Sequence, residues 1–479
     1  MNKEYDVTIG LEVHCELLTN SKIFSSSPNS HSELANSNVS EVDLGLPGIL
    51  PVVSGASVEK AIKMSMALNC ELPKYMYFDR KNYYYPDLPK GYQITQTKEP
   101  VGINGYVNVY VGDTVKRIDI HDIHLEEDTA SLDHFDNYSL INYNRSSIPL
   151  LETVTTPCMH SADEALAFLE ALRRMFLYTN ISEARTDRGQ MRCDVNISLA
   201  PKGSNVLGTK VELKNINSFS NVKLAIEYEI KRQTEVLNEG GSLVMETRRF
   251  DDTTGKTYRM REKVENLDYK YFTEPNIPPF LITNELVTKL KEELPVLQYD
   301  RIVKYMEEYG LSLYDSEILT KNIETATYFE DAISKCDDIK TVANWINTRI
   351  LGYVNKEEIN IKDCTFTTDD LVSLIGYINS NTISTKQAKD VFYKCLEENK
   401  KPEVVIKENN MEQITNSDEI LNVIKEVINE NMELAKEYDP EKGRVVDFFV
   451  GQVMKKTRGK ANPKTAMDLI KNELLKVER

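Results

Sequence analysis

The sequence lacks the features that mark membrane-spanning, secreted and disulfide-stabilised proteins. No run of roughly 18 apolar residues occurs, the length that a membrane-spanning helix needs, so we expect no membrane partner. The first residues, MNKEYDVTIG, lack the apolar core of a secretory signal, which predicts a cytoplasmic protein. The seven cysteines are scattered and none stands at CxxC spacing, so we expect reduced, mostly buried thiols.

Local motifs for nucleotide binding and covalent catalysis are also missing. There is no GxxxxGK[ST] loop, because the pairs Gly255-Lys256 and Gly459-Lys460 lack the upstream glycine. GxSxG and HExxH are absent, and no Cys–His or Ser–Lys arrangement suggests a nucleophile. Any phosphate would therefore be bound by a sheet face and metal, and a step that needs a covalent intermediate would belong to another chain.

Acidic residues outnumber basic ones along the chain as a whole, but not near the C-terminus. The formal net charge is −17, which argues against a nucleic-acid partner for most of the chain. Between Lys442 and Lys464, however, seven basic residues stand against one acid. This segment, which contains Lys455, Lys456, Arg458 and Lys460, is suited to an RNA backbone, although a solvated helical end would look the same.

The pattern of apolar residues divides the chain into a sheet-rich part and a helical part. Short alternating runs recur up to EPNIPPF (274–280), together with amphipathic helices such as the one that Ser161 and Glu164 begin with a capping box. Beyond it the strand pattern largely disappears. We expect an α+β fold: a sheet-rich N-terminal domain with mostly antiparallel strands (1–284), an all-α domain (285–405) and a small all-α tail (410–479).

Several predicted strands carry ligand-type residues on one face. Strand residues alternate between two faces, so the polar residues of RCDVNIS (192–198), TIGLEVHCEL (8–17) and TKVELK (209–214) each share one side. With the acids of HLEEDTA and NRSSIPLLET they give the candidate set Glu12, His14, Glu126, Glu127, Glu152, Asp194, Asn196 and Glu212. Carboxylates gathered in one place repel one another unless a cation neutralises them, and Mg²⁺ with a substrate phosphate suits such a face. Alternatively, each segment is a separate solvated face and the acids never meet.

A second candidate is FDRKNYYYPDLPKGYQITQ (78–96). Arg80 and Lys81 stand beside three tyrosines, and cations next to aromatic rings suit a nucleotide or an RNA end. Prolines and Gly91 predict a rigid, irregular loop, where functional groups are often found. A tyrosine-rich turn packed on a sheet explains the same residues.

Taken together, these segments closely resemble the B-subunit family of bacterial glutamyl/aspartyl-tRNA amidotransferases. The resemblance rests on long motifs in order along nearly the whole chain: GLEVHCEL (10–17), DRKNYYYPDLPKGYQITQ (79–96), HLEEDTA (124–130), NRSSIPLLE (144–152), RCDVNIS (192–198), VELKNINSF (211–219), METRRFD (245–251), YKYFTEPNIPP (269–279) and GQVMKKTRGKANP (451–463).

The resemblance implies a fold and an activity. The family has a sheet-rich cradle, a helical domain and a helical tail that contacts tRNA, and works with an amidase (glutaminase) subunit and a small third subunit. Using ATP and Mg²⁺, it phosphorylates the side-chain carboxylate of misacylated Glu-tRNA(Gln) or Asp-tRNA(Asn). Ammonia from the amidase then displaces phosphate, so the complex is a glutamine-dependent carbon–nitrogen ligase. The sequence does not distinguish the two tRNAs.

The same resemblance assigns roles to individual residues. The residues expected to act in catalysis and to hold metal, directly or through water, are Glu12, His14, Glu126, Glu152, Asp194 and Glu212. Those expected to bind ATP are Arg80, Lys81, Asn82, Asn196, Lys214 and Asn215, and those expected to bind tRNA are Lys455, Lys456, Arg458 and Lys460.

One departure from the family concerns zinc. Many members carry a CxC pair and a CxxC pair before the Leu-Gly-Leu-Pro-Gly turn, where this chain has Ser25-Ser26-Ser27 and Ser40-Glu41-Val42-Asp43. Serine is a poor zinc ligand, so we expect no structural zinc.

Two other functions compete with the ligase. A catalytically silent tRNA-binding scaffold would not need acids and lysines concentrated on single strand faces. A free-standing amino-acid ligase is disfavoured by the basic tail and by the missing glutaminase apparatus.

Overall fold

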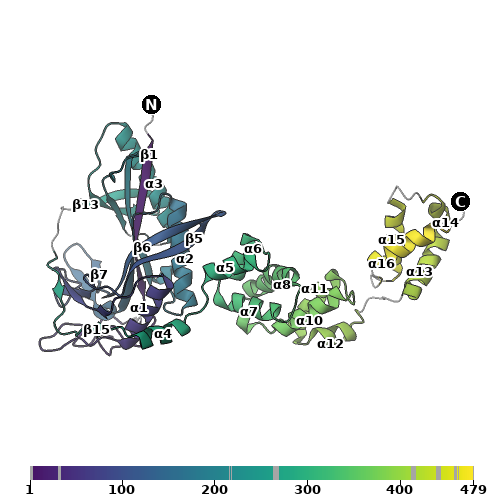
Figure 1. Ribbon diagram of the computed structural model, residues 1–479, viewed down its shortest axis with the longest axis horizontal. Coiled ribbons are helices and arrows are strands. Elements are labelled where there is room, and N and C mark those ends of the chain that lie inside the picture. Colours follow the sequence, from purple (N-terminus) through teal and green to yellow (C-terminus); the bar gives the residue numbers. More distant parts are fainter. Residues whose placement is uncertain are drawn as a thin grey trace. The chain divides into compact units, whose positions relative to one another are not determined.

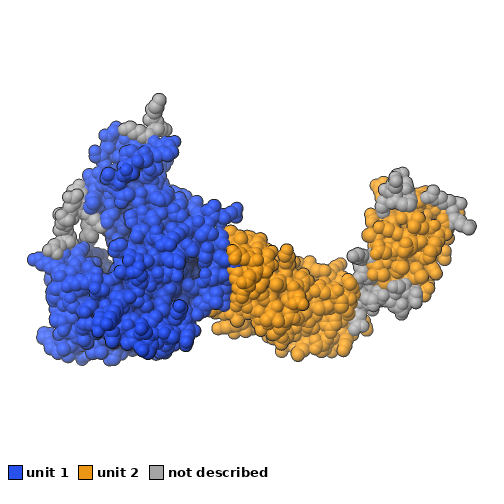
Figure 2. Space-filling model, in the orientation of Figure 1, with its two compact units in different colours: residues 1–303 blue, residues 304–479 orange. Residues whose placement is uncertain are grey.

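The computed structural model describes residues 4–30, 34–214, 216, 218–262, 269–411, 417–438, 444–457, 461 and 463–477. The chain forms two compact units, residues 1–303 and 304–479 (Figures 1 and 2). Three residues with predicted roles, Asn215, Arg458 and Lys460, lie outside the described residues.

The N-terminal unit is built on an eight-stranded sheet in the order β13-β12-β11-β10-β1-β9-β6-β5. Neighbouring strands are antiparallel except for the parallel pair β11 and β12, so the predicted mostly antiparallel sheet is confirmed. The strands are β1 (Tyr5–Glu16), β5 (Gly102–Val111), β6 (Thr114–Glu127), β9 (Pro149–Thr155), β10 (Met191–Pro201), β11 (Val211–Lys214), β12 (Glu246–Asp251) and β13 (Lys256–Glu262).

One face of this sheet is apolar and covered by helices. On β1, Ile9, Leu11, Val13 and Cys15 are fully buried because they alternate with the polar residues of the other face. Helices α1 (Gly55–Ala67), α2 (Ala162–Tyr178) and α3 (Phe219–Asn238) pack into the same core, with α2 and α3 side by side (Figure 1). The opposite face of the central strands is therefore left for polar side chains.

Smaller sheets frame the N-terminal unit. Strand β3 (Asp79–Asn82) lies between β4 (Tyr92–Thr95) and β14 (Phe272–Thr273), which brings the tyrosine-rich segment next to residues 269–274. Two further pairs are β2 (Tyr75–Met76) with β15 (Phe280–Leu281), and β7 (Ser131–His134) with β8 (Ser139–Asn142).

Beyond β15, the residues that the structure describes form helices and their connections, as predicted. After α4 (Asn284–Glu292), the described helices are α5 (Gln298–Glu307), α6 (Leu313–Leu319), α7 (Ile323–Ile333), α8 (Ile339–Trp345), α9 (Leu351–Lys356), α10 (Thr368–Asn379), α11 (Thr385–Glu398), α12 (Pro402–Glu408), α13 (Ser417–Glu430), α14 (Met432–Lys436), α15 (Arg444–Lys456) and α16 (Pro463–Leu474). A π-helical turn, Ile346–Ile350, joins α8 to α9. In the described part of the chain, no helix has the length and apolarity to cross a membrane.

The second unit holds two separate hydrophobic clusters. One runs from Tyr305 to Ile406 and the other from Ile420 to Leu474. The division of the chain into three domains, with boundaries at 284 and around 405–410, stays a prediction. At Ser161 the capping box is only half formed: the hydroxyl accepts from the amide of Glu164, but the Glu164 carboxylate accepts from the amide of His160.

The four positions that correspond to the family's zinc ligands, Ser25, Ser27, Ser40 and Asp43, converge around the Asp43 carboxylate. It accepts hydrogen bonds from the Ser25 and Ser27 hydroxyls at 2.8 and 2.9 Å and from the Ser40 amide at 2.9 Å. The Lys22 ammonium lies 3.3 Å from it, and both charged side chains are fully buried. A buried ion pair thus occupies this place, and its ammonium would repel a metal cation. The absence of zinc stays a prediction.

We predict that Asp43→Asn lowers the free energy of unfolding of the N-terminal unit by about 3–5 kcal/mol, because it leaves the Lys22 charge buried and unpaired. Burial by itself raises the pKa of Asp43, but the Ser40 amide and the Lys22 ammonium hold that pKa below its usual value. The carboxylate therefore stabilises the fold above about pH 4, and this contribution is lost as the pH falls through the depressed pKa. Urea unfolding at several pH values measures it.

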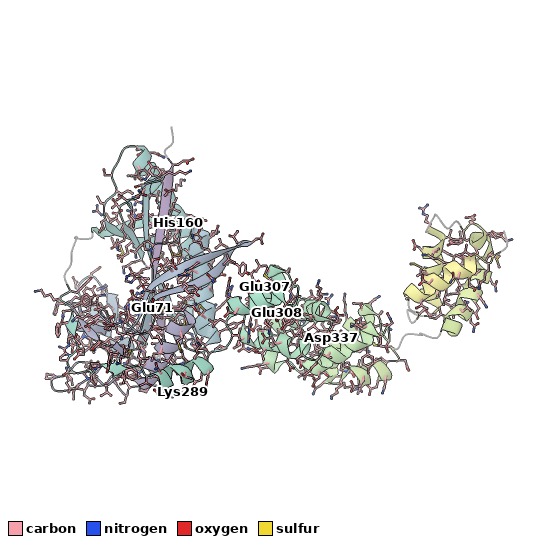
Figure 3. The ribbon with its side chains drawn as sticks, viewed as in Figure 1. Glu71, His160, Lys289, Glu307, Glu308 and Asp337 are labelled. Carbon is pink, nitrogen blue, oxygen red and sulfur yellow. The ribbon has the colours of Figure 1, made fainter. Side chains whose placement is uncertain are left out.

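The matched control is Glu71→Gln, which changes an exposed carboxyl of the same unit (Figure 3). An Asp43→Asn variant as stable as this control at neutral pH would show that the buried pair does not stabilise the fold.

Candidate metal centre

The polar face of the sheet brings together side chains from four adjacent strands. In the register, His124 on β6 faces Glu152 on β9, Glu152 faces His14 on β1, and His14 faces Arg192 on β10. Directly opposed residues of a sheet share a face, so these four side chains form one row. Their sequence positions are far apart, and strand pairing alone joins them.

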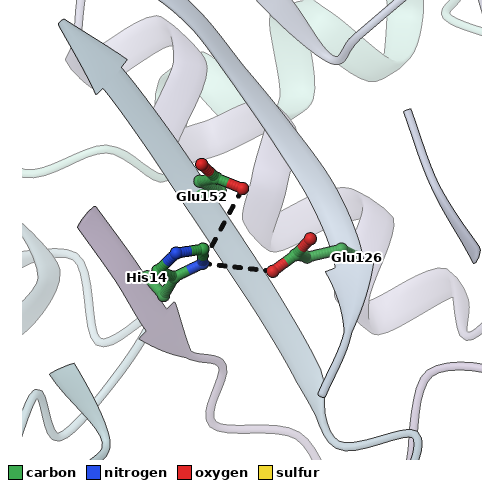
Figure 4. Close-up of side chains that lie close together, drawn as sticks. All are labelled: His14, Glu126 and Glu152. Carbon is green, nitrogen blue, oxygen red and sulfur yellow. Dashed lines mark hydrogen bonds and ion pairs between the residues drawn. The ribbon is translucent and has the colours of Figure 1, made fainter. Parts of the chain in front are cut away.

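The first cluster consists of His14, Glu126 and Glu152 (Figure 4). The His14 Nδ1 atom lies 3.1 Å from Glu126 Oε1 and 3.7 Å from Glu152 Oε2. The other Glu126 oxygen accepts a hydrogen bond from the Gln93 amide at 3.1 Å. These ligand atoms lie within 4.8 Å of one another, close enough to share one cation.

Charges within this cluster offset one another. Burial lowers the pKa of His14, but Glu152 and Glu126 outweigh it and raise the pKa to about 9. Burial raises the pKa of Glu152, but His14, His124 and Lys81 hold it well below its usual value. With this pKa His14 is an imidazolium near pH 7, and an imidazolium must lose its proton before its nitrogen can bind metal.

The second cluster consists of Glu12, Asp194 and Glu212. The Lys214 ammonium lies 2.5 Å from Asp194 and 3.6 Å from Glu212. Burial lowers the pKa of Lys214, but Asp194 and Glu212 raise it above its usual value, so this lysine is charged. The Asn196 amide nitrogen donates to Glu12 at 2.8 Å.

Both clusters fit a hard divalent cation. They offer carboxylate oxygens and one imidazole nitrogen, and carboxylates are the ligands that Mg²⁺ prefers. The Asn196 Oδ1 atom is buried and has no hydrogen-bond partner among the described residues, so another oxygen ligand stands on the same face. Residues of both clusters, Glu12, Glu126 and Glu152, line a cleft of about 440 Å³.

The tyrosine-rich segment contributes Lys81 to this cleft. Lys81 and Tyr271 both line it, and the Lys81 ammonium lies 5.1 and 5.8 Å from the ring centres of Tyr269 and Tyr83. Burial lowers the pKa of Lys81, but Glu126 and other acidic groups raise it above the usual value. A charged ammonium therefore stands beside the first cluster.

The two residues that flank Lys81 make contacts within the protein. The Arg80 guanidinium pairs with Glu274 and stacks 4.1 Å from the centre of the Tyr92 ring. The Asn82 amide donates to the Lys270 carbonyl at 2.8 Å, which ties β3 to residues 269–271. These contacts support the wall of the cleft.

Glu127, which the sequence grouped with the candidate acids, faces away from the cluster. Its carboxylate accepts from Lys90 Nζ at 2.6 Å, from the Ile94 amide at 2.9 Å and from the Ser147 hydroxyl at 2.8 Å. Neighbouring residues of a strand point to opposite faces, so only Glu126 can join His14.

The sequence reasoning missed Asp122 and His124. His124 Nε2 lies 3.0 Å from Glu152 Oε2, and its Nδ1 lies 2.7 Å from Asp122 Oδ1. Burial lowers the pKa of His124, but Glu152 and Asp122 raise it well above its usual value. The register of β6 shifts between Ile120 and Asp122, a β-bulge. Its sequence signal is a change of phase: Ile118 and Ile120 are buried at even positions, Ile123 and Leu125 at odd ones.

In the tail, the two described lysines with a predicted tRNA role differ in their contacts. Both Lys455 and Lys456 are exposed on the last turn of α15. The Lys456 ammonium pairs with Glu426 at 3.0 Å and Glu430 at 2.7 Å. Among the residues that the structure describes, Lys455 has no ion pair.

The chain matches known proteins along nearly its whole length. The family model described as "GatB/GatE catalytic domain" matches residues 7–288, and the one described as "GatB domain" matches residues 327–474. Proteins named as the B subunit of aspartyl/glutamyl-tRNA(Asn/Gln) amidotransferase are similar to it. That of Carboxydothermus hydrogenoformans is 43% identical, over 99% of this chain and 100% of the relative. That of Persephonella marina is 44% identical, over the same shares.

A third relative, from Geobacillus thermodenitrificans, is 43% identical over 98% of this chain and 99% of its own length. The resemblance seen in the sequence motifs is thus confirmed, and the acid clusters lie within the matched catalytic domain. The chain belongs to the GatB/GatE family, among the B subunits of aspartyl/glutamyl-tRNA(Asn/Gln) amidotransferases.

Proposed function

We propose that this chain is the ATP- and Mg²⁺-dependent subunit of a glutamine-dependent tRNA amidotransferase. It phosphorylates the side-chain carboxylate of Glu-tRNA(Gln), Asp-tRNA(Asn) or both, and ammonia from the partner amidase then displaces phosphate. The amidase and a small third subunit complete the complex, which acts in the cytoplasm, where charged tRNA is used. The observation that carries the proposal is the pair of acid clusters, each with a neighbouring lysine, on one face of the sheet.

The chemistry explains why such a face is needed. A carboxylate is a poor acyl donor because oxide is a bad leaving group, and phosphorylation provides a better one. The carboxylate and the γ-phosphate are both anionic, so positive groups must offset their repulsion before they can meet. Lys81 and Lys214 supply such charges beside the two clusters.

Each cluster has a distinct role in this proposal. His14, Glu126 and Glu152 hold one divalent cation, and Glu12, Asp194 and Glu212 hold another, directly or through water. When bound, the cations neutralise charge on phosphate oxygens. Gln93 fixes Glu126 and Asn196 fixes Glu12, so the ligands keep their orientation while substrates exchange. Asn215 is also proposed to bind ATP, and this proposal rests on the sequence motif alone.

Arg80 and Asn82 have a narrower role than the motif implied. Arg80 is paired with Glu274, and Asn82 donates to the Lys270 carbonyl. We therefore propose that these two residues act on ATP binding indirectly, by supporting the wall of the cleft, while Lys81 contacts phosphate. The tyrosines beside Lys81 offer ring faces for a base.

Glu12→Gln and Glu126→Gln are each predicted to reduce tRNA-dependent ATP hydrolysis by at least about 100-fold, because each removes a charged ligand of one cluster. Glutaminase activity of the same reconstituted complex should stay at the wild-type level, since it belongs to another chain. Phosphate release and glutamate release, measured in parallel with Glu-tRNA(Gln) and with Asp-tRNA(Asn), provide the two readouts and identify the preferred tRNA.

Glu307→Gln, which neutralises an exposed acid of α5, is the matched control and should leave both activities unchanged (Figure 3). Wild-type transamidation by the Glu12 and Glu126 variants would refute the assignment of the site. A silent scaffold would give no tRNA-stimulated ATP hydrolysis even with the wild-type chain.

The tail is proposed to bind the tRNA backbone through Lys455, Lys456, Arg458 and Lys460. Because Lys456 is already paired with two acids and Lys455 is not so paired within the described residues, Lys455→Glu should weaken tRNA binding more than Lys456→Glu. We expect a several-fold rise in the dissociation constant for Lys455→Glu and a shallower dependence on salt. Filter binding of charged tRNA to the complex at several salt concentrations tests this, and equal affinity of the wild type and both variants would exclude these lysines as contacts.

A further inference from the structure

The Glu152 carboxylate is held by a chain of three side chains from β6: His124, Asp122 and His121. Its Oε2 atom lies 3.0 Å from His124 Nε2, and the other nitrogen of that ring lies 2.7 Å from Asp122 Oδ1. The second Asp122 oxygen lies 2.6 Å from Nδ1 of His121, whose side chain is 71% exposed. Both hydrogen-bonding atoms of the His124 ring are therefore used, which fixes its orientation.

The backbone is built to make this contact. Because the β-bulge shifts the register of β6 between Ile120 and Asp122, Asp122 and His124 share the polar face with Glu126. His124 then stands directly opposite Glu152 across the β6–β9 pair. Asp122 stands opposite Val154, whose side chain cannot hydrogen-bond, and the Asp122 carboxylate contacts the two histidines instead.

A carboxylate that binds a cation has to point one way while the cation and substrate exchange. Glu152 receives such a fixed contact from His124, as Glu126 does from Gln93. Loss of a hydrogen bond of this kind, made to a metal ligand by a residue that does not itself touch the metal, commonly lowers metal affinity by about 10–100-fold.

We propose that Asp122 and His124 are positioning residues for Glu152: Asp122 fixes the imidazole, and the imidazole donates from Nε2 to the Glu152 carboxylate that faces His14 and Glu126. The inference rests on the proposed cation site. Neither residue touches the cation in this proposal, and both act through Glu152.

Binding of Mn²⁺ to the purified full-length chain, followed by electron paramagnetic resonance with Mg²⁺ as competitor, tests the proposal. His124→Asn keeps an amide near the position of Nδ1 but places none at Nε2, whereas His124→Gln places an amide donor near Nε2. Glu152→Gln should abolish Mn²⁺ binding at one site. At that same site we expect His124→Asn to lower the Mn²⁺ affinity by about 10-fold or more, and His124→Gln to keep most of the wild-type affinity.

Asp122→Ala should also lower the Mn²⁺ affinity of this site. In the His124→Asn background it should cause no further loss of affinity, because Asp122 acts through His124. His160→Gln, at an exposed histidine whose ring contacts the Val7 carbonyl, is the control and should bind Mn²⁺ like the wild type (Figure 3). Thermal unfolding of each variant separates lost binding from lost structure.

The outcomes distinguish the inference from the function on which it rests. If Glu152→Gln binds Mn²⁺ like the wild type, the cation site itself is wrong. If Glu152→Gln loses a class of Mn²⁺ while His124→Asn and Asp122→Ala keep it, only the positioning role is wrong. Equal losses for His124→Asn and His124→Gln would refute the donor role of Nε2. Should His124→Asn fail to fold, Asp122→Ala and His124→Gln decide the matter.

Discussion

The pairing of β1 with β9 on one side and with β10 on the other is the constraint on which the site depends. Glu12 and His14 point away from the core because they alternate with Leu11, Val13 and Cys15, which point into it. A shift of the strand register by one residue would exchange the two faces. The same register sets Glu152 opposite His14 and Asp194 opposite Glu12. The apolar core under α1, α2 and α3 therefore fixes which acids meet.

Positively charged groups and hydrogen-bond donors offset the repulsion among the acids on this face. The acids of the first cluster lie near His14, His124 and Lys81, and those of the second lie near Lys214 and Asn196. A cation that enters either cluster replaces a charge or a hydrogen bond that is already there. Positive groups can therefore exchange on this sheet face, which suits the proposed binding and release of a nucleotide.

Much of this was predictable from the sequence. Alternation indicated the strands and faces of 8–17 and 192–198, and the family resemblance supplied the proposal that they meet. The opposite directions of Glu126 and Glu127 follow from the same alternation. The ion pair of Arg80 with Glu274 could not be predicted in this way, because Glu274 lies far along the chain and only the pairing of β3 with β14 brings the two residues together. His124 was missed because the bulge breaks the simple period of the strand.

The bulge also bears on how the length of β6 can vary. His121 is the additional residue: without it, Ile120, Asp122, Ile123 and His124 would follow one another in simple alternation. Relative to β9, a chain shorter by this one residue would keep the same side chains on the same faces. On the other side, β5 has a matching residue, Asn104 with φ +55°, so the two strands would have to shorten together. Insertions and deletions within a sheet are usually excluded because they move every later residue to the wrong side. Here a change of length made in β5 and β6 together would leave Asp122, His124 and Glu126 on the polar face.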